Sequence, residues 1–98
     1  MQYRIEPIAL SKIWSFYRNV AKKYRHVYAY DDMERNIRQA ILGTRSIERT
    51  LPRRRPTLIR WQGMYMARSG QWYYAYRIDG EIITVCDACH QQNMHESE

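Results

Sequence analysis

The chain is 98 residues long, has a formal net charge of +6, and contains nine Tyr and three Trp against one Phe. A chain of this length forms one domain with one modest core, which leaves no room for a second unit, and the predicted domain spans residues 1–98 with a polar C-terminal tail at about 91–98. No apolar stretch of about 18 residues occurs and no apolar leader follows a cationic start, so we expect a soluble, cytoplasmic protein outside membranes.

The first half of the chain predicts a short strand followed by two helices. Residues 2–8 alternate in the manner of a strand, with a proline at its end. Apolar residues at 10–24 then recur at helical spacing and predict an amphipathic helix. Asp31 and Glu34 resemble a capping box, and they begin a second helical stripe that ends near residue 43.

The second half predicts an irregular connector and then three strands. Residues 44–57 carry two prolines and several arginines, which is typical of an exposed cationic loop. Strands are predicted at 58–68, 71–78 and 81–88, with turns at Ser-Gly and Asp-Gly between them. The fold class is therefore α+β in the order β-α-α-β-β-β, with two N-terminal helices packed on a small antiparallel sheet and the first strand at its edge.

The Asp-Gly pair at 79–80 is a strong hairpin signal and predicts a register. If these two residues form the turn, Tyr74 lies opposite Val85 and Trp72 lies opposite Asp87. One face of the strand then carries Trp72, Tyr74 and other rings. Such a stripe is typical of a base-stacking platform, and equally of an aromatic core that faces the helices.

Residues 86–90 read C-x-x-C-H, which is the attachment motif of a c-type haem. Cys86, Cys89, His90 and His95 also offer four nitrogen and sulfur ligands for zinc within ten residues. In a regular strand, residues three apart point to opposite faces, which disfavours both sites. We therefore expect two small thiols in the last strand and no metal or cofactor, with zinc and haem as remote alternatives.

Positive charge is concentrated in the first part of the chain. Residues 1–60 hold 14 Lys and Arg against 5 Asp and Glu, whereas residues 61–98 hold 2 against 5. Because guanidinium groups bind phosphate and carboxylate bidentately, this part favours nucleic acid or an acidic protein as partner. The arginines at 53–55, with Arg60 nearby, form a cluster that could bind a phosphate group. The alternative interpretation is a run of solvated charges without a ligand.

His90 follows the last predicted strand and is succeeded by two glutamines and an asparagine. We expect its ring to be partly exposed and able to transfer a proton near neutral pH. A structural or idle histidine is the alternative.

The stretch "RRRPTLIRWQGMYMARSGQWYYAYRIDGEIITVCDACHQQ" resembles the RelE/ParE superfamily of bacterial toxins. It is similar to that family in its basic Pro-containing loop, a Gly-aromatic strand, a ring-rich strand, a polar turn and an apolar last strand that ends in a histidine. Together with the strand and two helices before it, the resemblance covers nearly the whole chain, in element order and spacing more than in invariant residues.

The resemblance implies a type II toxin that cuts mRNA on the ribosome, without metal, by attack of a ribose 2′-OH on the adjacent phosphate. This chemistry needs a proton-transfer group and cations around the phosphate. The residues that match catalytic positions are His90, Arg68 and Arg55, with His95 as an auxiliary. The residues expected to bind RNA are Arg53, Arg54, Arg60, Lys22, Lys23, Trp72 and Tyr74.

Trp72 stands where the family commonly has an arginine, and the tyrosine often found near the terminal histidine is absent. These departures keep a second branch open, in which the chain inhibits DNA gyrase or binds another protein without cutting RNA. In either branch the resemblance implies an acidic antitoxin protein as partner. The expected assembly is a homodimer or a toxin–antitoxin hetero-oligomer. The ribosome and its mRNA are further partners in the cleaving branch.

Overall fold

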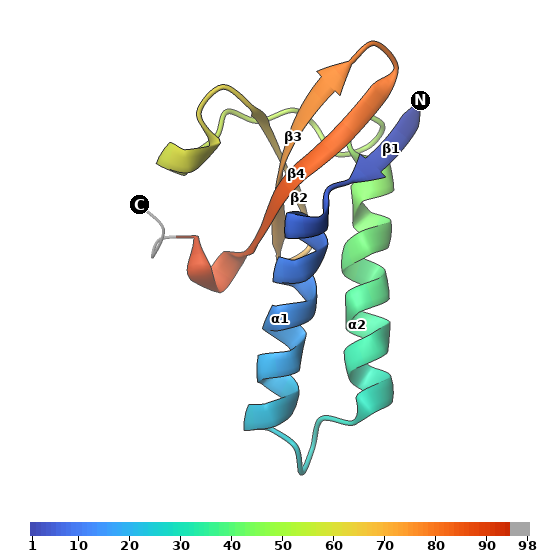
Figure 1. Cartoon of the computed structure of the whole chain (residues 1–98), viewed down its shortest axis with the longest axis vertical. Helices are drawn as coiled ribbons and strands as arrows, with labels where there is room; N and C mark the ends of the chain where they lie inside the picture. Colours follow the sequence, from blue (N-terminus) through green and yellow to red (C-terminus); the bar gives the residue numbers. More distant parts are fainter. Residues whose placement is uncertain (95–98) are drawn as a thin grey trace.

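Residues 1–94 are described by the structure, a computed structural model, and they form an α+β fold of two helices and a four-stranded mixed sheet (Figure 1). The α+β class is thus confirmed, and the elements occur in the order β-α-α-β-β-β. They are β1 (Gln2–Ile5), α1 (Pro7–Lys23), α2 (Tyr30–Gly43), β2 (Tyr65–Ser69), β3 (Trp72–Asp79) and β4 (Ile82–His90). Short 3-10 helices lie at η1 (Thr44–Ser46), η2 (Ile59–Trp61) and η3 (Gln91–Asn93).

The helix α1 begins at Pro7, which the sequence interpretation had placed at the end of a strand. At the first helical position the fixed φ of proline suits the helix, and the N–H that proline lacks would have no hydrogen-bond partner within the helix. The helix therefore starts earlier than predicted. Lys22 and Lys23 lie in the last turn of α1, where positive charge is favoured by the negative end of the helix dipole.

The helix α2 is capped two residues earlier than predicted. Ala29 is the N-cap residue, and the Asp32 carboxylate accepts a hydrogen bond from the Ala29 backbone N–H at 3.0 Å. Asp32 also forms an ion pair with Arg35, one turn further along the helix. The capping role predicted for Asp31 and Glu34 is therefore wrong, because Asp32 is the acidic residue that lies three positions after the N-cap.

The sheet has the strand order β1-β4-β3-β2. Strand β1 does join the edge of the meander, but it pairs with β4 in parallel, so the sheet is mixed and not antiparallel as predicted. The predicted strand at 58–68 forms only from Tyr65 onward. Residues 59–61 form η2 instead, and Gly63 has a φ of +88°, which interrupts the extended backbone.

The hairpin between β3 and β4 turns at Gly80 and Glu81, one residue later than predicted. Asp79 still pairs across the hairpin with Ile82. Gly80 has a φ of +60°, a conformation that glycine adopts without strain at the first position of a two-residue turn. The Asp-Gly signal therefore located the hairpin correctly but not the residues of its turn.

A β-bulge at Cys86 changes the second half of β4. Tyr76 pairs with Val85 whereas Ala75 pairs with Asp87, so Cys86 is an extra residue in the ladder. Beyond the bulge each β4 side chain lies on the face opposite to the one that regular alternation predicts.

The bulge also changes the partners of the ring-rich strand. The predicted pairs for Trp72 and Tyr74 are wrong, because the later turn shifts the register by two residues and the bulge shifts it by one more, so that they pair with His90 and Ala88. His90 is therefore brought to the same face as Trp72, and Asp87 to the other face.

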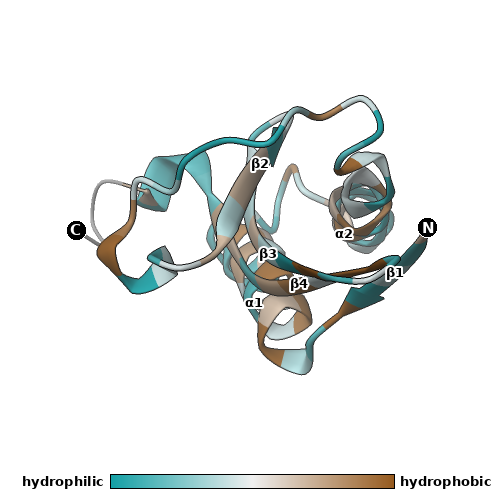
Figure 2. Ribbon diagram, turned by 90° about the horizontal axis from the view of Figure 1, so that it is seen from above, coloured by the Kyte–Doolittle hydropathy of each residue, from teal (hydrophilic) through white to brown (hydrophobic). Residues whose placement is uncertain are grey.

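The sheet curves around α2, with β1 and β2 at its two edges, whereas α1 lies outside this curve next to β4 (Figure 2). Strand β1 ends at Ile5, opposite Val85, and α1 then lies beside the remaining half of β4. This position lets α1 contact both faces of β4 at its end. No helix within residues 1–94 is long and apolar enough to cross a membrane.

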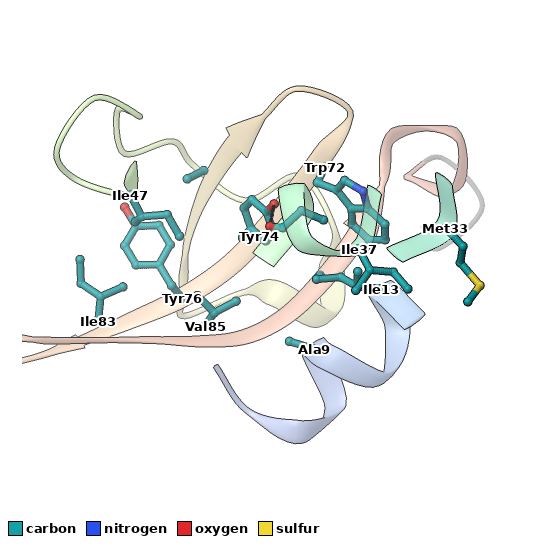
Figure 3. Close-up of a cluster of buried hydrophobic side chains, with 13 residues drawn as sticks. Ala9, Ile13, Met33, Ile37, Ile47, Trp72, Tyr74, Tyr76, Ile83 and Val85 are labelled. Atoms are coloured by element: carbon teal, nitrogen blue, oxygen red, sulfur yellow. Dashed lines mark hydrogen bonds between the residues drawn. The ribbon is translucent and has the colours of Figure 1, made fainter. Parts of the chain in front are cut away.

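Two apolar clusters cover the two faces of the sheet. The larger one lies between the helices and the sheet, and Figure 3 shows the rings of Tyr74 and Tyr76 within it. Its buried members are Ala9, Ile13, Met33, Ile37, Ala40, Ile47, Ala67, Trp72, Tyr74, Tyr76, Ile83, Val85 and Ala88. The smaller cluster lies on the opposite face, under the segment before β2, and its buried members are Leu58, Trp61, Met66, Ala75 and Cys89.

Candidate functional site

His90, the last residue of β4, is buried and not partly exposed as predicted, with 7% of its surface accessible. Its ring stacks on Phe16 of α1 at a centroid distance of 4.0 Å and meets the Trp72 ring edge-on at 5.4 Å. The burial follows from the bulge, which directs His90 toward α1.

Both ring nitrogens of His90 have partners. Nδ1 accepts a hydrogen bond from the Gln92 backbone N–H at 3.2 Å, so the ring proton is on Nε2, which lies 3.1 Å from Oε1 of Gln71. Burial lowers the pKa of His90 and favours the neutral ring. In this arrangement the histidine joins α1, the β2–β3 turn and η3, and it has no unshared nitrogen with which to accept a substrate proton.

The pH dependence of His90 gives a first prediction. We expect its imidazole to titrate below the ordinary value of 6.5 when followed by NMR of the ring C–H signals, because the charged form loses hydration on burial. The unfolded chain binds this proton at higher pH than the folded chain, so the free energy of unfolding falls as the pH drops below about 6.5 and stops falling below the folded-state pKa. A midpoint at or above 6.5 would contradict the buried position, and His90→Gln serves as the control that removes this pH dependence.

Arg68 lies on β2, and its register partner is Tyr73, one position from the row that contains Trp72 and His90. Neighbouring residues of a strand point to opposite faces, so Arg68 and His90 lie at the same end of the sheet but on different faces. Arg68 donates to the Gly70 carbonyl oxygen at 2.9 Å and to Oε1 of Gln91 at 3.1 Å. The structure thus connects Arg68 to the residue after His90 without bringing the two side chains together.

The arginines at 53–55 lie along the outer edge of β2. The backbone of Arg54 pairs with Met66 through two hydrogen bonds of 2.8 and 3.0 Å, which fixes the connector against the sheet. Arg53 is already engaged, because it donates bidentately to Glu48 at 2.9 and 3.1 Å and lies over the Tyr65 ring. Arg54 and Arg55 are exposed and make no side-chain hydrogen bond or ion pair with the rest of residues 1–94.

Trp72 and Tyr74, the predicted base-stacking rings, are 4% and 0% exposed. The indole N–H of Trp72 donates to the Tyr17 hydroxyl at 2.9 Å, and the Tyr74 hydroxyl donates to the Ala40 carbonyl oxygen. The structure therefore shows the other interpretation left open by the sequence, an aromatic core that faces the helices.

Lys22 and Lys23 are exposed at the end of α1 that points away from the sheet, far from the β2 edge that carries the arginine connector (Figure 1). The chain extends 45 Å along its longest axis, with the helical hairpin at one end. The predicted RNA-binding residues are therefore spread along the molecule and do not form one patch.

A second polar cluster was missed by the sequence interpretation, which singled out only its member Arg60. Asp87, 7% exposed, accepts hydrogen bonds from the Trp61 indole N–H at 2.7 Å and from Arg60 Nε at 3.3 Å. Lys12 of α1 lies 2.8 Å from its other oxygen. Burial alone would raise the pKa of Asp87, but the bonds from Lys12 and Trp61 together outweigh it, so this pKa is lowered.

The signal for this cluster in the sequence is a lone carboxylate within the apolar run "ITVCDAC". A buried carboxylate needs cations or N–H donors around it, so its presence in a strand predicts partners on elements packed against that strand. Their identity depends on the bulge and on the position of α1, which the sequence pattern does not specify.

Cys86 and Cys89 are free thiols. The Cys86 thiol donates to the Thr84 carbonyl oxygen at 3.4 Å, and Cys89 packs in the smaller apolar cluster. The bulge interrupts the alternation from which their opposite orientation was predicted, so that geometric argument does not apply. Within residues 1–94 no three His, Cys, Asp or Glu side chains are grouped to hold a metal ion, and His95 lies outside the described residues.

No family model matches this chain, and no curated protein matches it in sequence.

Proposed function

We propose that this chain is a toxin of the RelE/ParE type that acts on RNA of the translating ribosome and is neutralised by an acidic antitoxin protein. The chain order β-α-α-β-β-β supports this assignment, because the resemblance is one of element order and spacing. The excess of positive charge in residues 1–60 supports both the RNA target and the acidic partner.

The observation that carries the RNA target is the display of Arg54 and Arg55. Their side chains are exposed and form no ion pair with a carboxylate among residues 1–94, while the backbone of Arg54 is paired to Met66 of β2. Cations fixed on a rigid edge bind phosphates with less loss of conformational freedom than cations on a mobile loop.

The geometry supports binding of RNA more than cleavage. Arg68 and His90 lie on different faces, and both nitrogens of His90 are occupied. Cleavage by 2′-OH attack remains a second candidate, favoured by the Arg68–Gln91 hydrogen bond, which holds Arg68 at the same end of the sheet as His90. The third predicted catalytic residue, Arg55, lies on the connector and makes no hydrogen bond or ion pair with either of them. In that case the His90 ring must first release one of its hydrogen bonds to transfer a proton.

The RNA target is tested with the double variant Arg54→Gln, Arg55→Gln. We expect its affinity for a single-stranded RNA to fall about tenfold, and the plot of log affinity against log salt to become less steep by roughly 0.7 per lost phosphate contact. The matched control is Arg4→Gln, Arg38→Gln, which removes two exposed arginines elsewhere and should retain the wild-type slope. Equal losses in both pairs, or a flat salt dependence of the wild type, would overturn the phosphate role of the connector.

Induced expression in a bacterial host with mapping of mRNA 5′ ends separates the modes of action. Growth arrest without new 5′ ends, reduced by Arg54→Gln, Arg55→Gln but retained by His90→Gln, supports action by binding. New 5′ ends within codons that disappear in His90→Gln support the endonuclease. Inhibition of gyrase supercoiling by a chain that does not bind RNA would replace both with the gyrase alternative.

A further inference from the structure

A hollow of about 590 Å³ lies where α1 passes the end of β4. We call it the α1 groove. Its polar lining includes Lys12, Ser15, Asn19 and Arg60, and Phe16 and Trp72 contribute apolar surface. A second hollow shares Phe16, Asn19 and Asn93 with it and is also lined by Lys23, so the groove continues along α1.

We propose that the α1 groove binds a phosphate group of RNA between Lys12 and Arg60, an inference that rests on the proposed function for its ligand. None of the residues inferred from the resemblance to be catalytic lines this groove. It therefore adds a phosphate site to the one expected at the arginine connector.

The charge balance of the groove supports an anionic ligand. Lys12 and Arg60 contribute two positive charges, and Asp87 is the carboxylate that contacts both. The side chains of the two cations are 39% and 36% exposed, whereas that of Asp87 is only 10% exposed. A ligand that enters from solvent therefore meets the cations first, with one positive charge in excess.

The donors of both cations are only partly used. Asp87 contacts Arg60 through Nε, which carries one of the five N–H groups of the guanidinium. Asp87 also contacts the ammonium group of Lys12, which has three N–H groups. Asp87 also holds both side chains in place beneath the groove, so little conformational freedom remains to be lost when they bind a phosphate. Ser15 and Asn19 on successive turns of α1 are exposed at the same wall and supply neutral hydrogen-bonding groups for a ribose.

The test uses the full chain labelled with ¹⁵N and titrated with adenosine 5′-monophosphate, with adenosine as the phosphate-free control. We expect saturable changes of amide shifts at residues 12–19, 60 and 88–93 with the nucleotide and none with adenosine. Lys12→Gln and Arg60→Gln should each weaken binding at least tenfold. Lys12→Arg retains the charge and should bind within about threefold of wild type, and Arg18→Gln, which removes an exposed cation of the same helix outside the groove lining, should bind unchanged.

Shift changes scattered over the surface arginines, or equal affinity of wild type and Lys12→Gln, would overturn the groove site. If Lys12→Gln proves unstable, the comparison of Lys12→Arg with Arg60→Gln still tests the groove site, provided that both spectra are those of a folded chain. Equal affinities of these two variants for the nucleotide would overturn the site. The two proposals fail separately: a toxic chain that does not bind the nucleotide removes the groove, whereas nucleotide binding by a chain that neither arrests growth nor binds RNA removes the proposed function.

Discussion

Asp87→Ala is expected to lower the free energy of unfolding by about 3 kcal/mol, since it removes the acceptor of a buried indole N–H and the partner of two cations. Trp61 is 1% exposed, so its indole N–H is shielded from solvent and depends on the carboxylate as acceptor. Lys12 and Arg60 reach solvent and regain hydration, which keeps the loss below that of a fully buried ion pair. Urea unfolding at pH 7 measures the effect.

Two variants serve as controls for Asp87. Asp87→Asn keeps an oxygen acceptor for Trp61 but removes the charge, so we expect about half the loss. Asp79→Asn changes an exposed carboxylate in the β3–β4 hairpin and should alter stability by less than about 0.5 kcal/mol. Equal effects of Asp87→Ala and Asp79→Asn would show that the cluster does not stabilise the fold.

The lowered pKa of Asp87 fixes the direction of its pH dependence. The unfolded chain binds this proton at higher pH than the folded chain, so the stabilisation is complete above about pH 4 and is lost as the pH falls through the lower folded-state pKa. The difference in unfolding free energy between wild type and Asp87→Asn should therefore shrink in acid. The loss of stability that depends on His90 begins at higher pH, as the pH falls below about 6.5.

Tyr74→Ala is expected to have the largest effect on stability, about 3–5 kcal/mol, as for other aromatic truncations in a packed core. Tyr74 is fully buried between the sheet and the helices, and its hydroxyl donates to the Ala40 carbonyl oxygen near the end of α2. Tyr74→Phe keeps the ring and removes this bond alone, so we expect a loss of about 1–2 kcal/mol. Thermal and urea unfolding measure both variants.

The neighbouring Tyr73 provides the matched control. It points to the other face of β3 and is only partly buried, so Tyr73→Ala should cost clearly less than Tyr74→Ala. If Tyr74 served as a base-stacking ring, Tyr74→Ala would instead leave stability near wild type and weaken RNA binding by the 1–3 kcal/mol typical of one stacked base. The ratio of the two effects therefore decides between the core role and the stacking role.

The candidate site was predictable only in part, and His90 illustrates the reason. Its place at the end of the last strand follows from the strand pattern, but its burial against Phe16 follows from the bulge at Cys86. A bulge inserts one residue and exchanges the faces of all residues beyond it. The same exchange places Asp87 next to Trp61 and Arg60, and this contact has no periodic signal in the sequence.

The sequence by itself determined what depends on local pattern. Helical and alternating periodicity, proline and glycine positions, and the uneven charge were sufficient for the α+β class, the order of elements, the cationic connector and its exposure. The parallel pairing of β1 with β4, the bulge, the tautomer of His90 and the Lys12–Asp87–Arg60 cluster were decided by the tertiary structure. Each of these depends on contacts between residues far apart in the chain, and such contacts leave no periodic pattern in the local sequence.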